Sequence, residues 1–153
     1  MLISRKSFIA ALAVLAAAPL AFAGERGTSD EAVAMVKKAH AYYKAHGKDK
    51  ALAEFANPSG AFKDRDLYVM VYDKSGTCVA HGVNPKLVGK NLIDLKDPDG
   101  KLIVKGLVDT AFGSAGKGWV DYKWPNPVTK AVEAKSTYVE RADDVLIGVG
   151  VYK

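Results

Sequence analysis

Residues Gly118 to Val139 read GWVDYKWPNPVTKAVEAKSTYV and predict two strands joined by a turn that prolines mark. The two strands carry two tryptophans, two tyrosines and one lysine, Lys135, set deep in an apolar alternation. A small ligand pocket that excludes water needs aromatic walls and a few converging polar groups. We therefore expect this hairpin to form the floor and one wall of such a pocket.

Side-chain alternation divides each strand of the hairpin into two faces. On the first strand Val120, Tyr122 and Trp124 oppose Trp119, Asp121 and Lys123, and on the second Lys135, Thr137 and Val139 oppose Ser136, Tyr138 and Glu140. If Lys135 projects toward the face of Tyr122 and Trp124, its ammonium loses water and needs an anion, such as a ligand carboxylate. In the alternative, the two aromatic side chains are core and Lys135 reaches solvent.

The first 23 residues predict a secretory signal peptide. Arg5 and Lys6 form a positive start, residues 8–20 are a short apolar run, and Ala21-Phe22-Ala23 is a cleavage site of the A-x-A type. The alternative is an uncleaved anchor, for which the apolar run is short. Cleavage after Ala23 would give a periplasmic chain of 130 residues with 20 basic and 17 acidic side chains. No basic stripe stands out, so nucleic acid is not an expected partner.

The remaining chain predicts an α+β fold. Helices are expected at residues 32–45, at a short segment after Asp49, and at residues 101–112; strands are expected at residues 67–73, 77–81 and 145–152 beside the hairpin. This order predicts a PAS-like five-stranded antiparallel sheet with helices packed on one face. The expected division is a signal peptide (1–23), an N-terminal helical segment (24–60) and one domain (61–153). The first helix can pack on its own domain or pair with a second copy.

Templates for catalysis and metal binding do not fit this chain. His40 and His46 lie on different faces of their helix and form no metal pair, and no nucleophile motif accompanies His81. We therefore expect no catalytic residue, no metal and no cofactor. Cys78 is the single cysteine, on a strand, and we expect a buried structural thiol.

Four segments resemble the single Cache domain, a PAS-like extracellular sensor module of bacterial chemoreceptors and histidine kinases. They are LYVMVYDKSGTCVAH, NPKLVGKNLIDLKDPDGKLIV, GWVDYKWPNP with EAKSTYV, and VLIGVGVY, which together span about residues 66–152. The resemblance implies a pocket between the sheet and the loop-helix crossover that accepts small organic acids. Carried over by position, it implies Tyr122, Trp124 and Lys135 as ligand-binding residues, with His81, Val88 and Tyr138 as further candidates.

Typical family members continue into a transmembrane helix and a signalling domain, whereas this sequence stops at Lys153. The expectation is thus a free-standing exported protein that captures a short carboxylate and presents it to a membrane receptor or transporter. Two alternatives stay open. One is a homodimerising or partner-binding module, paired through its N-terminal helix, whose pocket is filled by side chains. The other is a small secreted enzyme.

Overall fold

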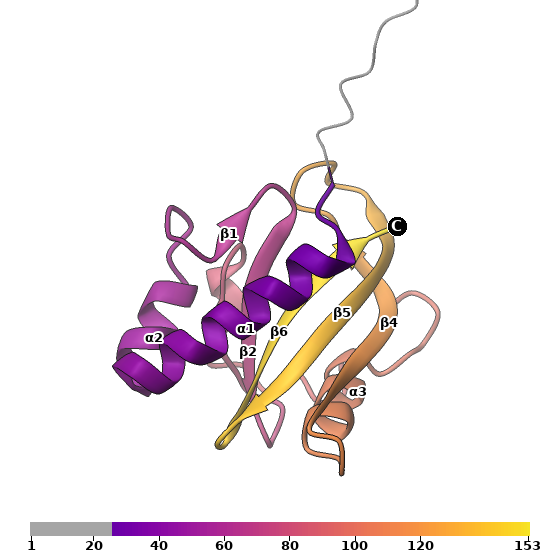
Figure 1. Ribbon diagram of the computed structural model, residues 1–153. Helices are drawn as coiled ribbons and strands as arrows, with labels where there is room; N and C mark the ends of the chain where they lie inside the picture. Colours follow the sequence, from indigo (N-terminus) through magenta and orange to yellow (C-terminus); the bar gives the residue numbers. More distant parts are fainter. Residues whose placement is uncertain (1–25) are drawn as a thin grey trace, which may run out of the picture.

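The computed structural model describes residues 26–153; the expected signal peptide and its cleavage site lie outside them. The elements in chain order are α1 (Ser29–His46), α2 (Lys48–Phe55), β1 (Lys63–Asp64), β2 (Leu67–Asp73), β3 (Cys78–His81), the 3-10 turn η1 (Pro85–Leu87), α3 (Ile103–Ala111), β4 (Lys117–Pro125), β5 (Val132–Ala142) and β6 (Val145–Tyr152). These elements form one open antiparallel sheet with helices around it (Figure 1).

The sheet has the strand order β1-β2-β6-β5-β4, and β3 also pairs with β2. The five strands expected from the sequence are present, and the α+β, PAS-like class is confirmed. The sixth strand, β1, has only two residues and pairs Lys63 with Tyr68. Such a short segment carries no alternation pattern, which is why its sequence did not predict it.

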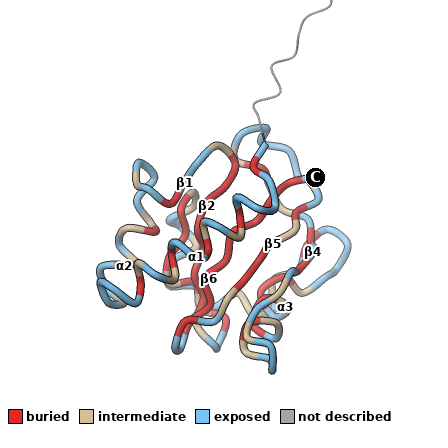
Figure 2. Tube along the Cα trace, in the orientation of Figure 1, coloured by how far each residue is buried: buried red, intermediate tan, exposed pale blue. Residues whose placement is uncertain are grey.

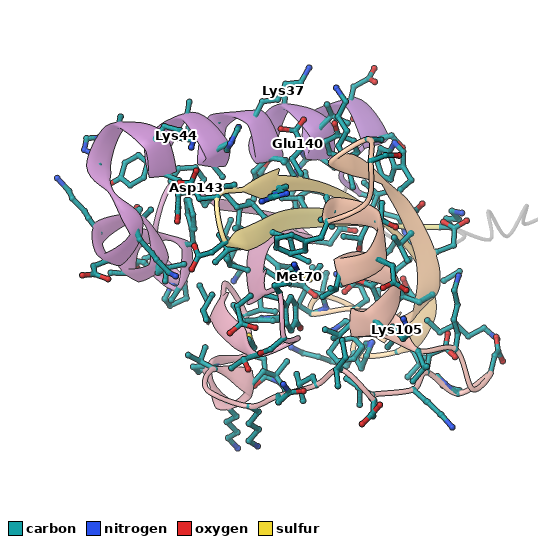
Figure 3. The ribbon with its side chains drawn as sticks, turned by 90° about the horizontal axis from the view of Figure 1, so that it is seen from below. Lys37, Lys44, Met70, Lys105, Glu140 and Asp143 are labelled. Carbon is teal, nitrogen blue, oxygen red and sulfur yellow. The ribbon has the colours of Figure 1, made fainter. Side chains whose placement is uncertain are left out.

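The prediction that all helices pack on one face of the sheet was wrong. One apolar core joins α1 and α2 to Val69 and Val71 of β2, and a second core joins α3 to Met70 and Tyr72 of the same strand. Because successive residues of a strand point to opposite faces, these two sets show that β2 is covered on both sides. Figure 3 shows the sheet lying between α1 and α3, and Figure 2 shows β2 and β6 as buried strands.

Helix α1 begins with a capping box, in which the Thr28 hydroxyl accepts the Glu31 backbone N–H and the Glu31 carboxylate accepts the Thr28 backbone N–H. Its apolar stripe is buried against its own sheet and consists of Ala32, Val36, Ala39 and Tyr43. Lys37 projects from the opposite side of the helix, away from the sheet (Figure 3). The stripe expected as a possible pairing surface is therefore used inside the domain, and the homodimer stays a prediction.

Cys78 is fully buried, as expected, and its thiol contacts the Ala80 carbonyl oxygen at 3.6 Å. Burial raises the pKa of this thiol to about 11, so it stays protonated at neutral pH. Within residues 26–153, no helix has the length and apolar character that crossing a membrane requires.

Candidate functional site

The β4–β5 hairpin has the register that brings Tyr122 directly opposite Lys135. Val120 and Tyr122 are buried in the core under α3, and half-buried Trp124 packs against the same core. The faces predicted from alternation on this hairpin are thus confirmed. Because the bulky β4 side chains face α3, the hairpin forms the floor of the space beneath that helix.

Lys135 is 1% exposed and runs across the neighbouring strand β6 to reach β2. Its Nζ donates a hydrogen bond to the Tyr68 hydroxyl at 2.7 Å and lies 4.8 Å from the centre of the Tyr152 ring. Gly150 makes this path possible, because a Cβ atom there would lie 2.1 Å from Lys135 Cε. The absence of a side chain at Gly150 of β6 therefore leaves the space that the Lys135 side chain occupies.

Burial makes the charged form of Lys135 less favourable than it is in water. Loss of solvation lowers its pKa from the ordinary 10.5 to about 7, although the negative charge of Asp66 acts in the opposite direction. At neutral pH the side chain is thus near its midpoint. A bound anion would stabilise the charged form and raise this pKa.

A directional chain of hydroxyl groups leads away from the lysine. The Tyr68 hydroxyl accepts from Lys135 and lies 3.3 Å from the Tyr152 hydroxyl, which donates to the Pro125 carbonyl oxygen at 2.9 Å. Because the Tyr152 proton is committed to Pro125, Tyr68 donates to Tyr152. Burial raises the pKa of Tyr68 well above its ordinary value, so these phenols remain neutral hydrogen-bond donors.

His81, at the end of β3, is 2% exposed and stacks on Tyr68 with ring centres 5.0 Å apart. Its Nδ1 accepts the backbone N–H groups of Val83 and Asn84 at 3.3 and 3.0 Å. Nδ1 is therefore the unprotonated nitrogen, and Nε2 carries the proton and acts as a donor. Burial, and then the nearby charge of Lys135, lower the pKa of His81 to about 3, so the ring is neutral at physiological pH.

These groups surround a small cavity between the sheet, α3 and the crossover from β3 to α3. Its lining residues are Tyr68, Met70, Tyr72, His81, Leu95, Ile103, Val104, Leu107, Tyr122, Trp124 and Lys135. The volume is about 10 Å³, which is the room of roughly one water molecule. A wider open cavity of about 240 Å³ adjoins it, sharing His81 and Trp124 and bordered by the turn after β4. Trp124 is half-buried and lines both spaces.

Four of the six predicted ligand residues line this cavity, namely Tyr122, Trp124, Lys135 and His81. Val88 does not, since it follows η1 and is 41% exposed. Tyr138 lies on the opposite face of β5, where its ring packs on Trp119 and its hydroxyl donates to Glu140. The reason is parity, because Tyr138 comes three positions after Lys135 on the same strand, and residues an odd number of positions apart point to opposite faces. These two residues were placed wrongly in the pocket.

Three contributors to the site escaped the sequence argument, namely Tyr68, Tyr152 and Gly150. Each belongs to a strand that reads as a continuous apolar run, LYVMVYD or VLIGVGVY. Such runs do not alternate between apolar and polar residues, so they do not predict which face of the strand lines the cavity. The available signal was the pair of glycines in VLIGVGVY, since a glycine inside a strand indicates close approach of another group.

A family model described as "Single Cache domain 2" matches residues 29–153. The chain belongs to this family. Cache domains are extracellular or periplasmic sensor domains that bind ligands and signal, rather than enzymes. The matched range includes α1 and α2 as well as the sheet, which agrees with the apolar core that they share in this Cache domain.

Two curated relatives have the same kind of domain within much longer proteins. The sensor histidine kinase MctS of Rhizobium johnstonii is 37% identical over 90 residues, and the methyl-accepting chemotaxis protein McpP of Pseudomonas putida is 33% identical over 91 residues. Each alignment includes 58% of this Cache domain chain, but only 19% of MctS and 16% of McpP. The chain thus spans less than a fifth of either relative.

Solved structures agree with the fold. A methyl-accepting chemotaxis protein from Vibrio parahaemolyticus superimposes with a TM-score of 0.69 at 28% identity, covering 80% of this chain and 86% of that one. A Cache chemosensory domain described in terms of carboxylic acid recognition gives a TM-score of 0.68 at 27% identity, covering 81% and 92%. The sequence-based assignment to the Cache family is therefore confirmed.

Proposed function

We propose that this Cache domain is an exported sensor domain that binds a short organic acid, with the carboxylate held by Lys135. The observation that supports this most directly is the buried Lys135 ammonium, which ends in a cavity among neutral donors. The neutral Nε2–H of His81 and the indole N–H of Trp124 are further donors on the cavity wall. A carboxylate is the partner that such a set of donors favours.

Apolar side chains limit the size of the acid. Val104 and Leu107 of α3 and Met70 of β2 give the cavity apolar walls, so the tail of the acid is expected to be short. Because the cavity holds about one water molecule, even a two-carbon acid has to displace lining atoms. Trp124 is the side chain with room to move, toward the open cavity beside it. Binding therefore includes an outward movement of Trp124.

The test is a thermal-unfolding screen of the purified protein with small acids, amines and amino acids. An acid present at about 100 times its Kd stabilises the folded state by roughly 2.7 kcal/mol, which raises Tm by several degrees. Lys135→Met should abolish the effect, whereas Lys90→Met, at an exposed lysine outside the cavity, should preserve it. Acid binding that survives Lys135→Met would refute the role of the lysine.

Presentation of the bound acid to a membrane receptor or transporter is the accompanying proposal, supported by the two relatives that contain such domains. A purified receptor that binds the acid-loaded protein more tightly than the acid-free protein would support it. If no acid, amine or amino acid binds, the alternative of a partner-binding module with a filled pocket is favoured, for which the small cavity volume is the supporting observation.

A further inference from the structure

The crossover from β3 to α3, residues 82–102, connects opposite edges of the sheet on the face that carries the cavity. It leaves β3, which pairs with β2 at one edge, and reaches β4, the strand at the other edge. Its Leu87, Leu92 and Ile93 pack on the core under α3, and Leu95 lines the cavity. The crossover is therefore one wall of the cavity, and the sheet is another.

At the β3 edge the crossover is held by backbone hydrogen bonds. The Lys90 carbonyl oxygen accepts the Cys78 N–H at 2.9 Å, and the Cys78 carbonyl oxygen accepts the Gly89 N–H at 2.8 Å. Leu92 adds a third bond, from its N–H to the Gly76 carbonyl oxygen, at 2.9 Å. Because these bonds lie along the outer edge of β3, this end of the crossover is joined to the sheet much as a strand would be.

At the β4 edge the crossover is held by side chains instead. Asp97 is 8% exposed, and its Oδ1 accepts the N–H groups of Asp99 and Lys101 at 3.0 and 2.9 Å, which forms a turn. Its Oδ2 accepts the N–H of Lys123 in β4 at 3.0 Å. The Lys101 ammonium donates to the Asp121 carbonyl oxygen, and the Lys123 ammonium pairs with Asp99 at 2.9 Å. We call these three links to β4 the Asp97 clasp.

The Asp97 clasp joins two walls of the cavity. Lys123 stands between Tyr122 and Trp124, which line the cavity from β4. Asp97 comes two residues after Leu95, which lines it from the crossover. These two walls cannot separate beside Trp124 while Asp97 holds the Lys123 N–H. A cavity with room for roughly one water molecule has to widen before an acid fits, so the clasp limits one direction in which it widens.

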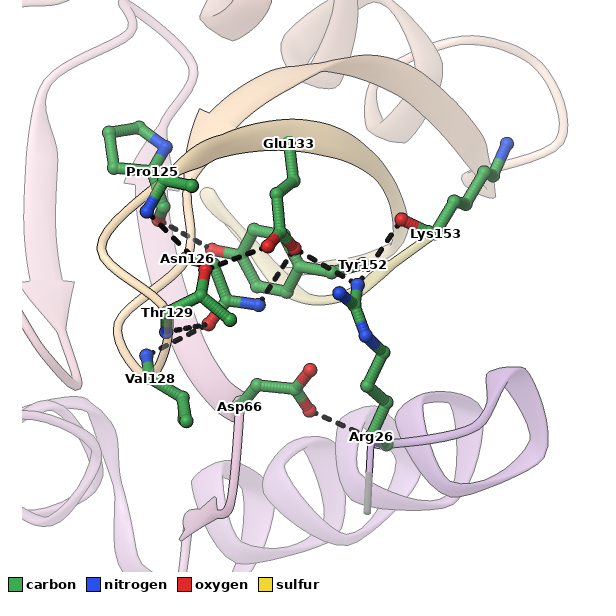
Figure 4. A network of polar contacts seen from close by, with 11 residues as sticks. Arg26, Asp66, Pro125, Asn126, Val128, Thr129, Glu133, Tyr152 and Lys153 are labelled. Atoms are coloured by element: carbon green, nitrogen blue, oxygen red, sulfur yellow. Dashed lines mark hydrogen bonds and ion pairs between the residues drawn. The ribbon is translucent and has the colours of Figure 1, made fainter. Parts of the chain in front are cut away.

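The backbone on the other side of Trp124 is held by separate contacts (Figure 4). The Pro125 carbonyl oxygen accepts the Tyr152 hydroxyl at 2.9 Å, and the side-chain amide of Asn126 donates to Glu133 at 3.0 Å. In addition, β4 pairs with β5 along its whole length. Opening the clasp therefore frees the crossover rather than β4.

We propose that Asp97 is a positioning residue whose clasp holds the crossover against β4 and opens when a small acid enters or leaves the cavity. The clasp is formed both with and without the acid and is broken during its passage. Loss of the clasp therefore speeds entry and exit alike and changes the affinity little. The role in acid passage rests on the proposed function, whereas control of access to Lys135 does not.

The first test needs no ligand and uses Asp97→Asn. This variant keeps Oδ1 for the turn but places an N–H donor, in place of Oδ2, opposite the Lys123 N–H. In hydrogen-exchange measurements the Lys123 amide should exchange about tenfold faster, because a hydrogen bond to a charged acceptor is lost. The amides of β6 should keep their wild-type rates, which distinguishes local opening from a general loss of stability.

Access to the cavity is measured on Lys135 itself. Its pKa of about 7 leaves most of the side chain as a neutral amine at pH 8, the form that reacts with formaldehyde. Reductive methylation of Lys135 by formaldehyde and cyanoborohydride, followed by mass spectrometry of peptides, should be about tenfold faster in Asp97→Asn. Lys101→Met removes one clasp contact made by an exposed side chain, and it should speed methylation by a smaller factor, about threefold.

Asp73→Asn is the matched control. Asp73 forms the same kind of turn at the end of β2, where its Oδ1 accepts the N–H groups of Ser75 and Thr77 at 2.9 and 3.0 Å. That turn belongs to the β2–β3 hairpin and lies at the opposite edge of the sheet from β4. The substitution should therefore leave exchange at Lys123 and methylation of Lys135 unchanged.

Acetate then tests the passage of an acid. The NMR line shape of the Trp124 indole N–H during an acetate titration gives Kd and the dissociation rate constant together. In Asp97→Asn the rate constant should rise about tenfold while Kd changes by less than about twofold. Damage to the site itself would instead weaken Kd. Absence of acetate binding counts against the proposed function alone, because the methylation rates still decide whether the clasp controls access to Lys135.

Two ligand-free results would overturn the proposal. One is a wild-type rate of Lys135 methylation in Asp97→Asn, or in Lys101→Met if Asp97→Asn does not fold. The other is an acceleration of the β6 amides equal to that of Lys123, since Asp97 would then act on the stability of the whole domain. With acetate bound, an unchanged dissociation rate constant in Asp97→Asn would rule out the opening of the clasp during acid passage.

Discussion

The ammonium of Lys135 lies 2.7 Å from the hydroxyl of Tyr68, although 67 residues separate the two and β6 lies between their strands. The contact joins β5 to β2 above the middle of the sheet, and Gly150 leaves the space for it. Burying the ammonium of a lysine costs free energy unless hydrogen-bond acceptors or an opposite charge offset the lost solvation.

Gly150→Ala should displace the lysine, because the new methyl group would lie 2.1 Å from Lys135 Cε and 2.4 Å from Thr137 Oγ1. We expect a loss of about 1–3 kcal/mol in the free energy of unfolding, measured in urea, and loss of acid binding. In a Lys135→Ala background the same substitution should have a smaller effect, since one of the two clashes is gone. Equal losses in both backgrounds would argue against the path described for Lys135.

Acid binding should weaken as pH rises, because only the charged form of Lys135 attracts a carboxylate. With a pKa of about 7 in the free protein, affinity should fall about 100-fold between pH 6 and pH 9. Organic acids are ionised throughout this range, so the ligand contributes no titration of its own. Calorimetric titration at several pH values checks this, and a constant Kd would contradict it.

Stability without ligand should change with pH in the opposite sense. The folded-state pKa of Lys135, about 7, is lower than the ordinary 10.5, so between these values the unfolded chain binds more protons and stability rises with pH. From pH 7.5 to pH 9.5 the wild type should gain about 2 kcal/mol relative to Lys135→Met. Parallel urea-unfolding curves for the two proteins over this range measure the difference, and the same pH dependence in both would disprove it.

Tyr68→Phe removes the hydroxyl that accepts from Lys135 and leaves a buried donor without a partner. The Lys135 midpoint should therefore move below 7, and stability should drop by about 1–2 kcal/mol. Tyr42→Phe, on the other face of the sheet, is the control and should leave the midpoint unchanged. NMR titration of the labelled lysine distinguishes these outcomes, and a midpoint that stays in place would show that Tyr68 does not stabilise the charge.

Export is a separate prediction, since residues 1–25 lie outside the described part of the chain. The mature protein recovered from the periplasm of an expressing bacterium should begin at Gly24. Intact-mass measurement of the periplasmic fraction checks this. A mass that retains residues 1–23 would indicate an uncleaved anchor instead.

Local patterns were enough to predict most elements of the fold. The stripe of α1, the alternation in β4 and β5, and the turn residues between strands each act over a few residues, so the sequence alone indicated their type and the faces of Tyr122 and Lys135. The same parity that places Lys135 in the cavity excludes Tyr138 from it. Tyr138 was a candidate only through the family resemblance, whereas the alternation of β5 had assigned it to the face opposite Lys135.

Sequence by itself determined the antiparallel α+β fold, the family and the face on which Lys135 lies, because these follow from periodicity and from ordered segments. Tertiary structure alone decided that helices cover both faces, since β2 and β6 are apolar throughout and show no exposed side. It alone also brought Tyr68, Gly150 and Tyr152 to the end of Lys135. Those contacts join residues far apart in the chain, and their distances depend on the order in which the strands pair.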